Sequence, residues 1–67
     1  MTIEKLKEEY PEGTKVLLLE TMNDSQGVPA GTVGIVRDVD DIGTIHVSWE
    51  TGSSLGLIPD EDVFKIL

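Results

Sequence analysis

The spacing of apolar residues along the chain changes after the first dozen positions. Ile3, Leu6 and Tyr10 recur at intervals of three and four residues, which places them on one face of a helix. Pro11 ends this helix, because the residue before a proline is pushed toward extended geometry. The pattern predicts a short helix over about residues 2–10, with the threonine at its start as the N-cap.

From residue 14 onward, apolar and polar residues alternate in short runs separated by turn-forming residues. A period of two is typical of strands that bury one face. The clearest run is 44–49, in which Ile45, Val47 and Trp49 alternate with polar side chains. Five strands are predicted, over residues 14–20, 32–39, 44–49, 53–58 and 63–67. The predicted connections are a long loop over 21–31, a hairpin loop over 40–43, a tight turn over 50–52 and one turn of 3₁₀ helix over 59–62.

Five strands in so short a chain bury most apolar surface when they curl into a barrel, which also removes sheet edges. We expect a mainly β fold, a five-stranded SH3-like barrel (about 14–67) with a short N-terminal α-helix, in one domain over residues 1–67. The strand over 14–20 is apolar on both faces, which favours the barrel interior on one side and the helix on the other, so we expect the helix to cover one side or one end of the barrel. Gly34, inside a strand, predicts a bend, a bulge or a close backbone approach. The expected core residues are Val16, Leu18, Val33, Val36, Ile45, Val47, Leu55, Leu57, Phe64 and Ile66, with Trp49 at the margin.

The composition excludes several classes of protein to which the chain could belong. The chain has 67 residues and no cysteine, which excludes disulfides, zinc ribbons and thiol catalysis. Its longest apolar run, over 16–19, is far shorter than the roughly 20 residues of a membrane span. The first residues lack the apolar stretch of a signal peptide. We expect a cytoplasmic protein.

The charge restricts the partners. Thirteen acidic and five basic residues give a formal charge of −8, and the cations are scattered. Nucleic-acid binders cluster Lys and Arg against phosphates, so neither nucleic acid nor an anionic membrane is expected as a partner. The acidity serves solubility in the simplest interpretation. The sharper interpretations are a basic partner, or imitation of a nucleic acid.

Two patterns suggest a catalytic site or a calcium site, but neither meets the requirements of such a site. His46 shares one strand face with Ser48, and Asp38 could complete a triad, but an open sheet face offers no pocket and no oxyanion hole. The acidic run that begins at Asp38 fails the EF-hand pattern at positions 5 and 12, so a turn with an Asx-type hydrogen bond is the better interpretation. We therefore expect no enzyme activity, no cofactor and no metal site.

A few residues are candidates for binding instead. Trp49 points inward by alternation, so core packing is the leading interpretation, but at the end of its strand a half-exposed indole could anchor a partner. The candidate binding residues are Trp49, His46, Tyr10, Asp40 and Asp41.

Several segments carry a family resemblance. Residues 13–16, 29–36, 45–52 and 58–59 together resemble a short uncharacterised domain family of bacteria, their phages and mobile elements. Gly31, Gly34 and Val36 are also similar to the motif of KOW-type barrels. The resemblance covers nearly the whole chain and implies an SH3-like, KOW-like small barrel, in a family with no assigned activity.

The function expected from the sequence is that of a non-enzymatic binding module with a protein partner. The alternative is an acidic nucleic-acid mimic, a decoy inhibitor from a phage or mobile element. Self-association into a homodimer stays open, because a poorly covered barrel or an unpaired edge strand would favour it.

Overall fold

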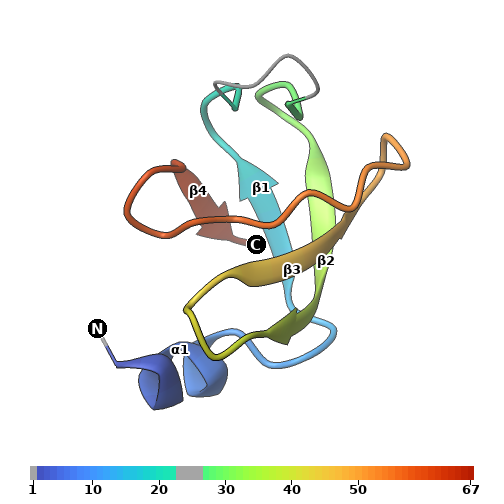
Figure 1. The fold of residues 1–67 in the computed structure, drawn as a ribbon. Helices are drawn as coiled ribbons and strands as arrows, with labels where there is room; N and C mark the ends of the chain where they lie inside the picture. Colours follow the sequence, from blue (N-terminus) through green and yellow to red (C-terminus); the bar gives the residue numbers. More distant parts are fainter. Residues whose placement is uncertain (1, 23–26) are drawn as a thin grey trace.

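The structure, a computed structural model, describes residues 2–22 and 27–67. Within these ranges the fold is mainly β, with a short helix before a four-stranded antiparallel sheet of order β3-β2-β1-β4 (Figure 1). The elements are α1 (Ile3–Glu9), β1 (Lys15–Leu18), β2 (Val33–Val39), β3 (Ile45–Trp49) and β4 (Phe64–Ile66).

The predicted helix forms for the reasons seen in the sequence. The Thr2 side chain accepts a hydrogen bond from the backbone N–H of Lys5 at 3.2 Å, as an N-cap does. Tyr10 is the C-cap, directly before Pro11. Seven residues are too few for a stable isolated helix, so α1 depends on docking through Leu6, which is 5% exposed and part of the core.

Of the two expected positions of the helix, cover of the second face of β1 is wrong and cover of one end is confirmed. Figure 1 shows α1 at the end of the sheet where β1 begins and the β2–β3 hairpin lies, and Leu6 approaches that hairpin at Gly43. The helix therefore closes one end of the core. Leu17 is consequently only partly buried, and Leu19 is 43% exposed.

The prediction of five strands is also wrong. Residues 53–58 contribute one bridge, between Leu57 and Ile45, with N–O distances of 2.7 and 2.9 Å. The reason is local: the N–H of Leu55 donates to the Ser53 hydroxyl, and its carbonyl accepts from the Trp49 indole. These groups are then unavailable for a strand ladder, and the described strands form a four-stranded open sheet in which closure into a barrel is not seen.

The core follows the predicted alternation over most of its length. The predicted residues that the structure buries are Val16, Leu18, Val36, Ile45, Val47, Trp49 and Leu57. A further set is buried that the sequence did not predict, comprising Leu6, Met22, Val28, Thr32 and Val39. Met22 and Val28 are joined by a backbone hydrogen bond of 3.1 Å, so the two ends of the long predicted loop fold onto the core. Residues 23–26 of that loop lie outside the described ranges.

Four predicted core residues are corrected. Val33, Leu55 and Phe64 are only partly buried, and Ile66 is 49% exposed. Ile66 belongs to β4, which is an edge strand and has no neighbour on its outer side. Val33 points away from the core because Gly34 takes the inward position beside it.

A β-bulge explains why simple alternation fails in β2. The register of β2 against β3 shifts between Val36 and Asp38, which pair with Val47 and His46. The extra residue changes which side chains point inward, so that Val39 is buried while Asp38 is exposed.

Whether a helix of this chain could cross a membrane can be judged for the described ranges. α1 has seven residues, and no helix there reaches the length and apolar character that a membrane crossing requires.

Candidate functional site

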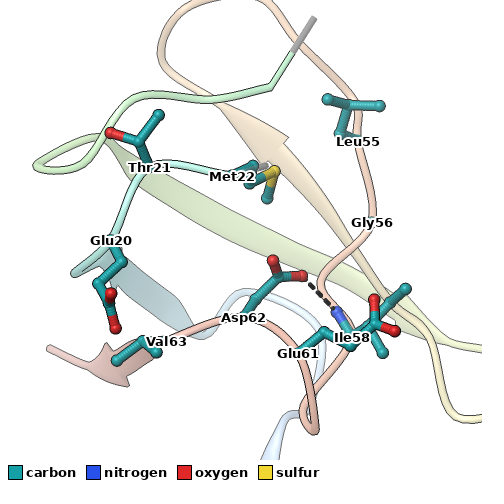
Figure 2. Close-up of a pocket in the computed structure, with 9 residues that line it drawn as sticks. All are labelled: Glu20, Thr21, Met22, Leu55, Gly56, Ile58, Glu61, Asp62 and Val63. Atoms are coloured by element: carbon teal, nitrogen blue, oxygen red, sulfur yellow. Dashed lines mark hydrogen bonds between the residues drawn. The ribbon is translucent and has the colours of Figure 1, made fainter. Parts of the chain in front are cut away.

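In the described residues, a groove lies between two segments of the chain that are hydrogen-bonded to each other at one end. One wall is the stretch 20–22, which follows β1, and the other is the stretch 55–63 (Figure 2). Its volume is about 550 Å³. Within the described residues, no hydrogen bond joins 20–22 to 55–58, so the groove lies where the open sheet leaves these two segments unpaired.

The groove combines an apolar base with an acidic rim. Apolar contributions come from Met22, which is buried, Leu55, which is partly buried, and Ile58 and Val63, which are each 43% exposed. Among the described residues, the carboxylates of the lining are those of Glu20, Glu61 and Asp62, and none of the lining residues is a cation. The site can therefore accept an apolar side chain beside positive charge.

The wall over 58–63 is held by a turn. Both Glu61 and Asp62 donate their N–H groups to the carbonyl of Ile58, at 2.9 and 2.8 Å. The Asp62 carboxylate in turn accepts the N–H of Ile58 at 2.8 Å (Figure 2). The sequence predicted one turn of 3₁₀ helix over 59–62; the structure has a hydrogen-bonded turn there, which the Asp62 carboxylate closes.

The two walls are tied together at the base of the turn. The carbonyl of Val63 accepts backbone hydrogen bonds from Leu19 at 2.8 Å and from Glu20 at 3.3 Å. Glu20 and Asp62 are thus positioned by the main chain rather than by long flexible contacts. The groove is largely preformed.

A second cluster lies at the β2–β3 hairpin. The carboxylate of Asp40 accepts the N–H groups of Ile42 at 3.1 Å and Thr44 at 2.9 Å, and its other oxygen lies 2.9 Å from Nε2 of His46. The hydrogen bonds from Thr44 and then His46 lower the pKa of Asp40 below its ordinary value of 3.8. The predicted Asx-type turn is confirmed, and the cluster stabilises the hairpin.

The sequence places the chain in a known family. All of residues 1–67 match the model of a family described as Domain of unknown function (DUF4314). The chain belongs to this family. No curated protein and no solved structure matches it. Membership in the DUF4314 family confirms the expected relation to an uncharacterised domain family, while the SH3-like barrel and the bacterial or phage origin stay predictions.

The five candidate binding residues do not form one site in this member of the family. His46 and Asp40 are in contact, and Asp41, beside them, forms an exposed ion pair with Lys7 at 3.3 Å. Trp49 is 3% exposed, and its indole N–H donates to the carbonyl of Leu55 at 2.8 Å. This is the placement of a core residue, so Trp49 is not available at the surface to anchor a partner.

Tyr10 lies apart from the hairpin cluster. Its ring packs against Phe64 with centroids 5.7 Å apart, and it borders a smaller hollow of about 280 Å³ beside α1. Partial burial, with the charge of Glu9, raises the pKa of Tyr10 above 10.0. Tyr10 therefore helps to close the end of the core at which α1 lies.

The groove residues were mostly missed because they come from segments far apart in the sequence. In the sequence the carboxylate nearest to the acidic run 60–62 is that of Glu50, whereas the fold places Glu61 and Asp62 beside Glu20. Glu50 belongs to the opposite part of the sheet, where its N–H donates to Val33. The sequence feature that could have predicted the groove is the presence of carboxylates at both ends of segments with weak apolar periodicity.

The lowered pKa of Asp40 gives a prediction about acid stability. A carboxyl whose pKa is depressed on folding contributes stability above its unfolded pKa and loses that contribution as the pH falls through the folded value. The difference in melting temperature between wild type and Asp40→Asn should therefore be largest near neutral pH and shrink below about pH 3.8. Thermal unfolding followed by circular dichroism across the acid range measures this difference.

Asp41→Asn is the matched control, because it changes the neighbouring carboxylate and leaves the three hydrogen bonds of Asp40 in place. Its exposed ion pair contributes little, so this variant should follow wild type at every pH. A wild-type advantage over Asp40→Asn that stays constant into strong acid would contradict the assignment.

Proposed function

We propose that this chain is a non-enzymatic binding module for a protein partner, and that its groove binds a basic segment of that partner which carries an apolar side chain. The observation that carries the proposal is the lining of the groove: an apolar base beside three carboxylates, with no cation among the lining residues that the structure describes.

The apolar base favours a side chain over a bare cation. Ile58 and Val63 are each 43% exposed, and burying such surface contributes about 25 cal/mol for each Å² removed from water. An aliphatic side chain of the partner would cover these two residues and reach Met22 below them.

The acidic rim favours positive charge on that segment. Glu20 and Glu61 are exposed, and each can attract a Lys or Arg at the edge of the groove. The formal charge of −8 adds a long-range field that speeds the approach of a basic partner. The same field repels acidic competitors.

The rigid walls reduce the cost of binding. The hydrogen bonds from Ile58 to Asp62 and from Leu19 and Glu20 to Val63 hold the groove before a partner arrives. A preformed site loses little conformational entropy on association. Other acidic residues of the described ranges lie on separate elements, on and after α1, at the β2–β3 hairpin and in the turn after β3, so the groove favours a peptide-like ligand over the role of nucleic-acid mimic.

The proposal predicts selective binding of a short basic peptide. The probe is acetyl-Lys-Arg-Leu-Arg-Lys-amide, and the comparison is the charge-reversed acetyl-Glu-Asp-Leu-Asp-Glu-amide. Titration followed by ¹⁵N–¹H NMR should shift the amides of 20–22 and 55–63 with the basic peptide alone. The double variant Glu20→Gln, Glu61→Gln should weaken binding roughly two- to thirtyfold, because each exposed charge contact contributes about 0.2–1 kcal/mol.

The control variant is Glu8→Gln, Glu9→Gln, which removes the same charge from the exposed face of α1. It should retain most of the affinity if the groove is the site. Equal losses in both double variants would mean that only net charge matters. Shifts confined to the hairpin or to α1 would reject the groove.

A further inference from the structure

We propose that the sheet face turned away from the core is a self-complementary dimer interface, so that two copies of this chain pair through it about a two-fold axis parallel to the strands. This outer face is made by Leu17, Val33, Ile35, Glu50 and Lys65, with their neighbours on the same side of the sheet. The proposal does not depend on the groove, because none of these five residues lines it.

The orientation of the outer face follows from strand alternation. Val16 and Leu18 are fully buried and Trp49 is 3% exposed, so the side chains next to them in sequence point to the other side of the sheet. Leu17 and Val33 are only partly buried there, and Ile35 and Leu19 are more than 40% exposed, so in the described residues this face is accessible to solvent.

The strand register places one complete row across this face. Leu17 is paired with Val33 on one side and with Lys65 on the other. The next position beyond Val33 is Glu50, whose N–H donates to the Val33 carbonyl at 3.0 Å. The row therefore runs Glu50, Val33, Leu17, Lys65 from the β3 edge to the β4 edge, with opposite charges at its ends and two apolar residues between them.

This order makes the row complementary to itself. A two-fold axis parallel to the strands sets β3 of one copy over β4 of the other, and β2 over β1. Glu50 then faces Lys65 of the second copy, twice by symmetry, while Val33 faces Leu17. An axis across the strands would set each charge over its own kind, so the charges select the first arrangement.

More apolar surface lies around this row. Ile35 is 42% exposed and Leu19 is 43% exposed. They extend the apolar surface in opposite directions, Ile35 on β2, where it is paired with Lys15, and Leu19 just beyond β1. Two sheets pack face to face about 10 Å apart, with strand directions within about 30° of each other. A face only four strands wide, roughly 19 Å, buries less than about 1,200 Å² in the pair, so the dimer is a weak one.

The test is a charge exchange read by sedimentation velocity over a series of concentrations, at about 0.15 M salt, where the Debye length is about 8 Å and distant carboxylates repel little. Wild type should show a reversible monomer–dimer equilibrium. Glu50→Lys and Lys65→Glu should each raise the dissociation constant about tenfold, because each sets two like-charge pairs in the symmetric interface. An equimolar mixture of the two variants should recover dimers, because both contacts are then attractive.

Matched controls separate the interface from net charge and from folding. Glu8→Lys and Lys5→Glu make the same charge changes on α1 and should leave the equilibrium near that of wild type. Ile35→Ser should weaken the dimer, whereas Ile42→Ser, at a position 86% exposed on the hairpin loop, should not. Circular dichroism verifies that each variant is folded.

Several results would overturn the proposal. Wild type that stays monomeric up to its solubility limit would end it, as would a variant mixture that associates no better than either variant alone. Failure of the basic peptide to bind the groove would leave these results unchanged, so the two proposals are tested separately.

Discussion

Replacing Trp49 with alanine should remove about 3–5 kcal/mol from the free energy of unfolding, the usual range for a fully buried large aromatic residue. A domain of 67 residues has only about 3–10 kcal/mol in total, so much of the Trp49→Ala population should be unfolded at room temperature. Urea unfolding followed by far-ultraviolet circular dichroism gives the free energy directly.

The size of this effect follows from what the indole touches. Trp49 is 3% exposed, its ring lies against the backbone at Gly34, and its N–H donates to the Leu55 carbonyl at 2.8 Å. Removing the ring opens a cavity and also frees the segment around Leu55, which otherwise has no ladder of its own. The loss therefore combines core packing with the attachment of the 53–58 segment.

A second substitution divides these two contributions. Trp49→Phe keeps an aromatic ring but removes the N–H donor, so it should cost less than Trp49→Ala while leaving the Leu55 carbonyl without its partner, a loss of about 1–3 kcal/mol. Ile42→Ala, at an exposed position, should stay within about 0.5 kcal/mol of wild type. A stable, well-folded Trp49→Ala protein would instead indicate a surface anchor, contrary to its burial.

The alternation of side chains predicted the central strands because burial on one face leaves a local mark. Ile45, Val47 and Trp49 point inward as their spacing requires, and all three are buried. The segment 53–58 carries a similar mark and yet forms a single bridge. This segment does not form a strand because the Ser53 hydroxyl and the Trp49 indole are hydrogen-bonded to the backbone of Leu55. A periodic pattern of apolar residues contains no information about such competition for backbone groups.

The groove could not be predicted from local patterns for a different reason. Glu20 and Met22 follow one strand, while Ile58 and Asp62 lie more than thirty positions later, and only the fold brings them together. Where the helix packs could not be predicted for the same reason, because the spacing of Leu6 does not show against which part of the sheet it lies. In contrast, the Asx-type turn at Asp40 was predictable, because donors and acceptor lie within four residues.

Gly34→Ala should destabilise the fold by about 1–3 kcal/mol, the usual cost of forcing an extra carbon into a packed core. A Cβ at this position would overlap Cγ1 of Val47 and lie 2.6 Å from Cε3 of Trp49. Neither neighbour can yield easily, because Val47 is 1% exposed and the Trp49 ring is held by its hydrogen bond to Leu55. The sequence predicted a bend, a bulge or a close approach at Gly34, and the close approach is confirmed.

The sign of this effect is informative because alanine would otherwise stabilise the strand. Where the backbone permits it, Gly→Ala gains about 0.4–1 kcal/mol by restricting the unfolded chain. Gly34 is not among the glycines with positive φ, so its backbone accepts alanine, and any loss must come from the contact with the β3 side chains. A more stable Gly34→Ala protein would show that the core has room at this point.

A double-mutant cycle with Val47→Ala isolates the contact. Val47→Ala removes Cγ1, the atom nearest to the added carbon, and leaves the backbone pairing of β2 and β3 unchanged. Gly34→Ala should therefore cost clearly less in the Val47→Ala background than in wild type, with a coupling of about 0.5–3 kcal/mol, as is usual for residues in direct contact. Additive losses would place the strain elsewhere, for instance in the Trp49 ring, and the same cycle with Trp49→Phe would then locate it.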